Sequence, residues 1–346
     1  MKRIAHRLLH RLDESVDARL ARRGGGIPPG KRVVIHPFRG FGRRHELLLR
    51  GRVLIEKRIT RVNEAEPLWR NLLNTYRRFQ SDEIGAARVV ATHREAVVET
   101  LTDGEGYFQL VLAPAELDLS LPWHEVALAL PDHGITATGL VLVPRDDAQF
   151  GIISDIDDTI VQTNATSVVR MARTIIRNAA SRLPFDGVVD LYRALHAGRN
   201  PVFYVSSSPW NFHDLLQDFM DLHGIPHGPM FLQDWGIDEE TLLTTAHETH
   251  KLEQIQLLLD YYPHLRFVLI GDSGQHDPEI YLRVIQSRPE RIAAAFIRDV
   301  THDLRDQAVA HLLDEARTAG VEMLYVRDSA EALHEARRLG LCEQGE

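Results

Sequence analysis

The chain is poor in cysteine and has no long apolar run, and each absence excludes a class of protein. Its 346 residues include one cysteine, Cys342, so neither a disulfide framework nor a cysteine-bound metal cluster is possible within it. A run of about 18 apolar residues, the length that spans a bilayer, is missing. The first residues also lack the apolar core of a secretory signal. We therefore expect a protein of a reducing, cytoplasmic compartment.

The composition is typical of a soluble globular protein, with 44% hydrophobic and 26% charged residues. The length allows two domains of ordinary size, each with its own core. The charge is unevenly distributed. Residues 1–50 contain 13 Lys or Arg and 4 Asp or Glu, a net charge of +9, whereas the whole chain carries −9. This asymmetry favours an anionic surface as the partner of the first segment.

Residues 1–30 are expected to form a basic amphipathic helix and a linker. Apolar residues recur at helical spacing from Ile4 to Leu20, with basic residues between them, and a Gly- and Pro-rich run from Gly24 to Gly30 ends the pattern. Such a helix lies well in the surface of an anionic membrane. An apolar stripe of this kind also packs on a neighbouring domain, so both alternatives stay open.

Residues 31–145 have short apolar runs separated by turn signals, which indicates a β-rich accessory domain. We expect an antiparallel sandwich or barrel, interrupted by one helix at residues 67–79. The predicted strands are residues 33–35, 52–55, 87–91, 96–101, 107–112, 125–130 and 138–143.

Residues 146–346 alternate between strands and helices, which predicts an α/β domain with a parallel sheet covered on both faces. The predicted strands are residues 150–154, 201–205, 267–270, 293–297 and 322–326. The predicted helices are residues 168–182, 188–196, 213–222, 251–261, 277–287, 308–319 and 330–339. In such a sheet the ligand site lies at the carboxyl ends of the strands.

Polar residues follow three of these strands in turn. The run at residues 155–159 follows the first, residues 206–209 follow the second and residues 271–278 follow the third, while Lys251 opens the helix before that third strand. Carboxylates, hydroxyls and a lysine at one edge of a sheet suit a metal or a phosphate group. We therefore expect one shared site.

Each of these elements also has an ordinary explanation. An acidic run at a strand end caps a helix or lies in a solvated loop, and Ser206 to Pro209 can cap the helix that follows. Asp272 can be a turn residue, and Lys251 a solvated helix residue. Four such coincidences in this order are much rarer than any one of them, which favours the shared site.

The order of these motifs resembles that of haloacid-dehalogenase-type phosphohydrolases. The matching residues are Asp155, Asp157, Thr159, Ser206, Lys251, Gly271, Asp272 and Asp277. The longer strings around them look like the catalytic domain of the actin-patch-associated phosphatidate phosphatases and their bacterial relatives. The resemblance covers roughly residues 149–330. It implies a Rossmann-like, haloacid-dehalogenase-type domain, preceded by a β-sandwich-like N-terminal domain.

The resemblance also implies a role for each catalytic residue. Asp155 would be the nucleophile that forms an aspartyl-phosphate, and Asp157 would protonate the leaving alkoxide and then activate water. Thr159 would position the Asp157 carboxylate. Ser206 would bind a phosphoryl oxygen, and Lys251 would balance the negative charge of Asp155 and the phosphate.

The cofactor implied by the resemblance is Mg²⁺, which prefers oxygen ligands. Asp155, the backbone carbonyl of Asp157, and Asp272 would hold it. Asp277 would either orient waters on the metal or pair with Lys251.

The implied substrate is phosphatidate, hydrolysed to diacylglycerol and phosphate, with Ser207 and Trp235 as the expected substrate contacts. One alternative is a phosphatase for a soluble phosphomonoester or a phosphoprotein. Another is a catalytically idle scaffold that binds anionic membranes through residues 1–50. No nucleic-acid partner is expected, and the expected location is the cytoplasm, with peripheral contact to a membrane surface left open.

Overall fold

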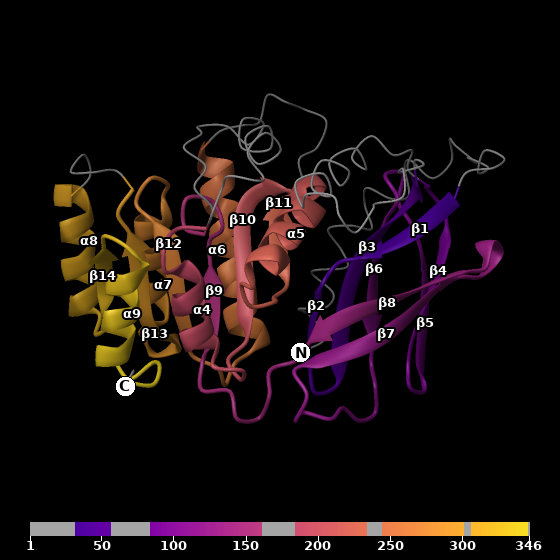
Figure 1. The fold of residues 1–346 in the computed structure, drawn as a ribbon, viewed down its shortest axis with the longest axis horizontal. Coiled ribbons are helices and arrows are strands. Elements are labelled where there is room, and N and C mark those ends of the chain that lie inside the picture. The colour runs from indigo at the N-terminus through magenta and orange to yellow at the C-terminus, as the bar shows by residue number, and fades with distance from the viewer. Residues whose placement is uncertain (1–31, 57–83, 161–183, 234–243, 301–305, 345–346) are drawn as a thin grey trace, which may run out of the picture. The chain divides into compact units, whose positions relative to one another are not determined.

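The computed structural model describes most of the chain, in residues 32–56, 84–160, 184–233, 244–300 and 306–344. These residues belong to two compact units, of which the first ends at Arg145 and the second begins at Asp146 (Figure 1). The predicted basic helix and linker at residues 1–30 lie outside the described residues, as do the predicted helices at residues 67–79 and 168–182.

The first unit is an eight-stranded mixed sheet. Its strands are β1 (Arg32–Pro37), β2 (Gly40–Arg43), β3 (Glu46–Glu56), β4 (Arg88–His93), β5 (Ala96–Leu101), β6 (Tyr107–Leu112), β7 (Trp123–Leu130) and β8 (Ile135–Leu142). The 3-10 helix η1 (Pro131–His133) connects β7 to β8. The strand order is β1-β3-β2-β8-β7-β4-β5, and β6 pairs with β3. The pairs are antiparallel except β2 with β8, which are parallel.

The core of this unit follows from the alternation of its strands. Along β6 and β7, every second residue is buried, which places Leu110 and Leu128 in one hydrophobic core. Val33 from the edge strand β1 and Val98 from the edge strand β5 contact the same core. The two ends of the strand order therefore share one core, and the sandwich-like arrangement of two layers stays a prediction.

The apolar pattern of the sequence predicts neither β2 nor the first half of β3. β2 contains two glycines, which normally weaken a strand signal. A Cβ atom at Gly40 would lie 2.2 Å from the backbone oxygen of Leu48, so the close pairing of β2 with β3 requires glycine there. Gly40 thus makes the pairing possible and at the same time weakens the strand signal in the sequence.

The second unit is a six-stranded parallel sheet with helices on both faces. Its strands are β9 (Gly151–Ser154), β10 (Val202–Pro209), β11 (Met230–Gln233), β12 (Phe267–Asp272), β13 (Ile292–Arg298) and β14 (Met323–Val326). Its helices are α4 (Val188–His196), η2 (Trp210–Phe212), α5 (His213–His223), α6 (Thr244–Tyr261), α7 (Asp277–Ser287), η4 (Pro289–Arg291), α8 (Asp306–Thr318) and α9 (Ser329–Arg338). Within the described residues, no helix has the length and apolar character needed to cross a bilayer.

The strand order of this unit, β11-β10-β9-β12-β13-β14, determines where a ligand binds. Every residue of β9 and β12 is buried, because α4 and α9 pack together on one face while α7 packs between α6 and α8 on the other (Figure 1). The order reverses around the central strand β9. The carboxyl ends of β9, β10 and β12 therefore meet at one edge, which is the usual binding site of such a sheet.

The structure confirms the predicted parallel α/β arrangement and corrects three of its elements. β11 was not predicted, because Met-Phe-Leu-Gln is too short to show a strand period. β10 continues through the serine run to Pro209, which pairs with Gln233 of β11 after a break in register. α6 begins at Thr244 instead of Lys251, because the polar residues before Lys251 show no apolar repeat.

Candidate active site

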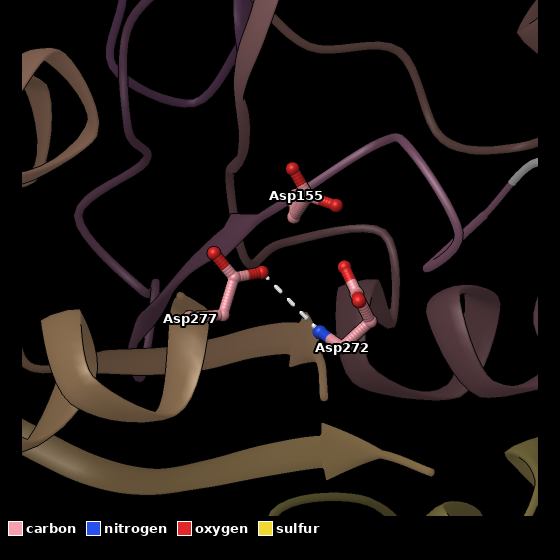
Figure 2. A group of neighbouring side chains, drawn as sticks. All are labelled: Asp155, Asp272 and Asp277. Carbon is pink, nitrogen blue, oxygen red and sulfur yellow. Dashed lines mark hydrogen bonds between the residues drawn. The ribbon is translucent and has the colours of Figure 1, made fainter. Parts of the chain in front are cut away.

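Three buried carboxylates meet at the carboxyl edge of the parallel sheet (Figure 2). Asp155 directly follows β9, Asp272 is the last residue of β12, and Asp277 is the first residue of α7. One oxygen of each lies within 4.8 Å of the others, and none of the three residues is more than 1% exposed. Gly271 allows this approach, because a Cβ atom there would lie 2.4 Å from Asp277 Oδ2. Such close, buried carboxylates require positive charge or protons nearby.

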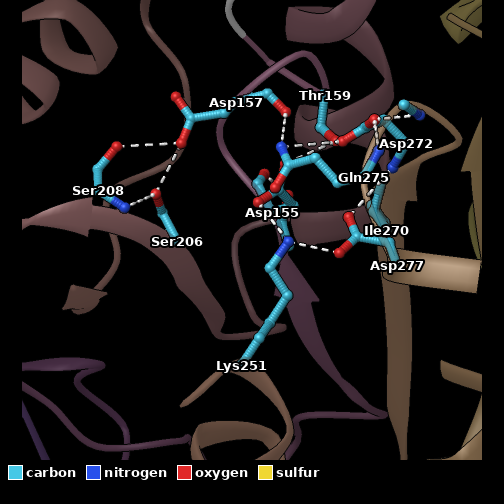
Figure 3. A network of polar contacts seen from close by, with 12 residues as sticks. Asp155, Asp157, Thr159, Ser206, Ser208, Lys251, Ile270, Asp272, Gln275 and Asp277 are labelled. Atoms are coloured by element: carbon cyan, nitrogen blue, oxygen red, sulfur yellow. Dashed lines mark hydrogen bonds and ion pairs between the residues drawn. The ribbon is translucent and has the colours of Figure 1, made fainter. Parts of the chain in front are cut away.

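Lys251 brings a positive charge to this group from the interior of α6 (Figure 3). Its ammonium donates to Asp155 Oδ1 at 2.9 Å and also to Asp277 Oδ1, and the residue is 3% exposed. Burial alone would lower the pKa of Lys251, but the surrounding carboxylates outweigh this effect and raise the pKa. The alternative of a solvated helix residue is therefore wrong. Of the two roles expected for Asp277, the structure contains the pairing with Lys251.

The chain turns sharply after Asp155. Asp158 has a φ of 56°, in the left-handed region, and the turn brings Thr159 back toward the strand end. The Thr159 hydroxyl donates to Asp155 Oδ2 at 3.1 Å. Thr159 thus orients Asp155 and not Asp157, which corrects the prediction, because the turn returns the chain to the residue four positions earlier.

Asp157 points to the other side of the site, toward the end of β10 (Figure 3). Its Oδ2 accepts hydrogen bonds from Ser206 Oγ at 2.8 Å and from Ser208 Oγ at 3.0 Å. Ser206 and Ser208 are buried and share a face of the extended run, whereas Ser207 between them is partly exposed. Neither η2 nor α5 has a side-chain cap, so the alternative that these serines cap a helix is wrong.

The sequence patterns do not predict a role for two residues of this site, Ser208 and Gln275. Ser208 had an available signal, because alternate residues of an extended run share a face and Ser206 was already assigned to the site. Gln275 had none, because its role depends on a contact across the fold. Its Nε2 donates to the backbone oxygen of Asp157 at 3.3 Å, 118 positions away, and to Asp272 Oδ2 at 3.4 Å.

The electrostatics of the site indicate an excess of negative charge. Burial raises the pKa of Asp155 well above its ordinary value, against the opposing effect of Lys251. Burial and the neighbouring Asp277 raise the pKa of Asp272 to about 7. Burial also raises the pKa of Asp157, although hydrogen bonds from two serine hydroxyls oppose it. The oxygen donors and the unbalanced charge fit a divalent cation with hard-ligand preference.

The structure thus brings most of the predicted site residues into one connected group. That group consists of Asp155, Asp157, Thr159, Ser206, Lys251, Asp272 and Asp277. Ser207 alternates with Ser206 and Ser208 along the same strand and so lies on its other face; its contact with a substrate stays a prediction. Trp235 lies outside the described residues, so its contact with a substrate stays a prediction.

The same residues lie in a segment with known relatives. Residues 150–299 match the model of a family described as "Phosphatidate phosphatase APP1, catalytic domain". This segment is similar to the APP1 catalytic domain over 150 of the chain's 346 residues. The match confirms the resemblance inferred from the motifs. It begins after the first unit, which ends at Arg145, so the assignment of that unit as an accessory domain stays a prediction.

Two yeast proteins are similar to this chain over this part of the sequence. Phosphatidate phosphatase APP1 of Saccharomyces cerevisiae is 34% identical over 159 residues, which are 45% of this chain and 27% of the relative. An uncharacterized protein of Schizosaccharomyces pombe is 30% identical over 156 residues, 44% of this chain and 26% of the relative. The aligned part thus spans about a quarter of each relative.

One solved structure with some similarity is a HAD family hydrolase from Deinococcus radiodurans R1 with bound phosphate and sodium. It has 14% sequence identity and a TM-score of 0.35, over 57% of this chain and 100% of that chain.

Proposed function

We propose that this chain is a haloacid-dehalogenase-type phosphatase that hydrolyses phosphatidate to diacylglycerol and inorganic phosphate, with Asp155 as the nucleophile. One observation carries the proposal. Asp155 is buried at the end of β9, with the Lys251 ammonium 2.9 Å from its Oδ1. Asp157 lies two residues further on and accepts a hydrogen bond from Ser206 instead. Two carboxylates with different environments suit the two roles of nucleophile and proton donor.

In the first step, an Asp155 oxygen attacks phosphorus and the bond from phosphorus to the substrate oxygen breaks. Thr159 and Lys251 hold the Asp155 carboxylate in one orientation for this attack. Asp157 gives its proton to the leaving alkoxide, which becomes the alcohol diacylglycerol. The raised pKa of Asp157 favours the protonated form that this step requires. Both serine hydroxyls donate to Oδ2, which leaves Oδ1 to carry the proton.

In the second step, water attacks the phosphorus of the aspartyl-phosphate. The Asp157 carboxylate, now deprotonated, accepts a proton from that water. The bond from phosphorus to the Asp155 oxygen breaks, which releases inorganic phosphate and restores both carboxyl groups to their starting forms. Lys251 stays close to Asp155 in both steps and stabilises its negative charge.

The proposed cofactor is Mg²⁺, held by Asp155, Asp272 and the backbone carbonyl of Asp157. When bound, it neutralises the negative charge on the phosphoryl oxygens so that a carboxylate can approach them. The chain's own residues support this assignment, because Asp155 must be ionised to attack and Lys251 alone leaves its pKa raised. Asp277 holds Lys251 and, through Oδ2, accepts from the Asp272 backbone nitrogen at 3.2 Å.

The proposed substrate rests on the name of the yeast relative and on the family of the matched segment. Residues 1–50 carry a net positive charge, which favours an anionic membrane surface near the substrate. This charge favours peripheral contact to such a surface, and the proposed location is cytoplasmic.

The test is phosphate release by the full chain from phosphatidate in mixed micelles, compared with a panel of soluble phosphomonoesters, with and without Mg²⁺. Phosphatidate should be the preferred substrate, and chelation of Mg²⁺ should abolish release. Faster release from a soluble ester would contradict phosphatidate as the substrate but would still support the phosphatase reaction. No release from any ester would favour the membrane-binding scaffold. Co-sedimentation of the full chain with phosphatidate-containing vesicles then shows whether it binds the surface.

A further inference from the structure

Gln275 links the turn after β9 to the end of β12 (Figure 3). Its side-chain nitrogen donates to the backbone oxygen of Asp157 at 3.3 Å and to Asp272 Oδ2 at 3.4 Å. We propose, on the basis of the metal site in the proposed function, that this carboxamide takes the place of the cation in the metal-free protein and turns away when the cation binds. Gln275 thereby weakens cation binding and keeps the empty site ordered.

The two carboxylate oxygens of Asp272 have different kinds of partner, and only one of these partners can exchange. Oδ1 accepts from the backbone nitrogens of Gly274 at 2.6 Å and Gln275 at 3.0 Å, so it is held by the loop itself. Oδ2 accepts from the Gln275 side chain instead. A side-chain donor can leave without unfolding the loop, whereas a backbone donor cannot. Oδ2 is therefore the Asp272 oxygen that exchanges its partner.

The other contacts of Asp155 and Asp277 do not involve Gln275 and can persist when a cation binds. Asp155 is held by Lys251 and Thr159, and Asp277 is held by Lys251 and by the Asp272 backbone nitrogen. Gln275 instead donates to two oxygens of the proposed cation ligands, one in the turn after β9 and one at the end of β12. A primary amide has two N–H bonds, so one nitrogen can serve both acceptors.

The amide group and a cation exclude each other at these oxygens. The NH₂ end of a carboxamide is the positive end of its dipole, so a divalent cation on the same oxygens repels it. A neutral amide contributes only a modest net hydrogen-bond energy, which a divalent cation readily replaces. The carboxamide therefore stabilises the empty site without blocking the loaded one.

The position of Gln275 allows this movement. Asp272 and Asp277 are fully buried, but Gln275 is only partly buried and lies in the short loop between β12 and α7. Its backbone nitrogen is held by Asp272 Oδ1, so the proposed movement involves the side chain and leaves the backbone of the loop in place.

Isothermal titration of the full-length protein with MgCl₂ tests the proposal, with thermal unfolding in chelator and in saturating Mg²⁺ as a second readout. The variant is Gln275→Leu, which keeps the size of the side chain and removes its donor. Gln275→Ala is the second variant if leucine perturbs the fold. The control is Gln286→Leu, because Gln286 also donates its Nε2 to a side chain, Glu315 at 2.8 Å, but lies exposed on α7.

Gln275→Leu should bind Mg²⁺ about three- to tenfold more tightly than wild type, as expected when one or two net hydrogen bonds no longer compete. Its melting temperature in chelator should fall by about 2 °C, while its melting temperature in saturating Mg²⁺ stays near that of wild type. Gln286→Leu should leave the Mg²⁺ affinity unchanged.

Weaker Mg²⁺ binding by Gln275→Leu would overturn the proposal, because Gln275 would then help to hold the cation. Unchanged binding would overturn it as well, because Gln275 would be a bystander. In both cases the metal site itself would stand, since wild type binds. If wild type shows neither binding heat nor a Mg²⁺-dependent melting shift, the metal site of the proposed function fails and the proposal fails with it.

Discussion

The ammonium of Lys251 lies 2.9 Å from Asp155 Oδ1, and both residues are almost completely buried. The two come from elements far apart in sequence, α6 and the end of β9. A buried charge is stable only when it is paired, so each residue makes the other possible. Asp277 completes the group as a second partner of Lys251.

Lys251→Met should destabilise the protein strongly, because it leaves Asp155 and Asp277 without their buried counter-charge. We expect a loss of about 3–5 kcal/mol in the free energy of unfolding, measured by urea titration in chelator. Mg²⁺ should restore part of it. Arg317→Met removes an exposed ion pair with Asp314 and should change little. Equal effects of the two substitutions would contradict the role of Lys251.

Ser208→Ala should slow phosphate release more than Ser207→Ala. Ser208 donates to Asp157 Oδ2 at 3.0 Å, whereas Ser207 is partly exposed and faces away from that carboxylate. The Asp157 carboxyl becomes negatively charged as it gives up its proton. A hydrogen bond to a charged group contributes about 1.5–3 kcal/mol, so we expect kcat to fall by about ten- to a hundredfold. Steady-state kinetics on phosphatidate micelles measure this. A larger loss from Ser207→Ala would show that the wrong serine has been assigned.

Gly271→Ala should disturb the acidic group, because the new methyl group would lie 2.4 Å from Asp277 Oδ2. Overpacking of this kind costs about 1–3 kcal/mol. We expect a lower melting temperature and weaker Mg²⁺ binding. Gly104→Ala is the matched control, since a methyl group there meets nothing within 4 Å. If Gly271→Ala were as stable as that control and bound Mg²⁺ normally, the crowding at Asp277 would be refuted.

His124 should make the stability of the protein decrease in mild acid. Burial lowers the pKa of His124 from 6.5, and the nearby His93 lowers it further. The unfolded chain therefore binds a proton that the folded chain resists, so stability is full above about pH 6.5 and is lost as the pH falls below it. Urea titrations between pH 7.5 and 5.5 measure the effect.

The comparison for His124 is the difference between wild type and His124→Gln, because the raised pKa of Asp272 makes an opposite contribution that both proteins share. That difference should shrink as the pH falls, by at most about 1.4 kcal/mol per pH unit. His133→Gln, at an exposed histidine, should run parallel to wild type. Parallel curves for all three proteins would refute the prediction.

The sequence predicts the frame of the second unit well, because its elements have strong local signals. α4 and α7 were predicted with the bounds that the structure has, since their apolar positions repeat at helical spacing and flank buried strands. The order of motifs also placed Asp155, Lys251 and Asp272 in one site. These residues lie at strand ends or on the adjoining helices, where the topology alone brings them together.

What the sequence did not predict depends on contacts between distant segments. The turn at Asp158 determines which residue Thr159 contacts. No local sequence pattern predicts the left-handed conformation of Asp158. The pairing of Pro209 with Gln233 extends β10 through its serines and so selects Ser208 as a partner of Asp157. Gln275 reaches a carbonyl in another loop. Each is a tertiary contact that overrides the local signal.

The central claim is that Asp155 attacks phosphorus, and Asp155→Asn tests it most directly. Phosphate release from phosphatidate micelles in saturating Mg²⁺ should fall by at least about a thousandfold, because an amide cannot replace the carboxylate nucleophile. Asp190→Asn makes the same change at an exposed position of α4 and should keep wild-type release. Near-normal release by Asp155→Asn would contradict the account.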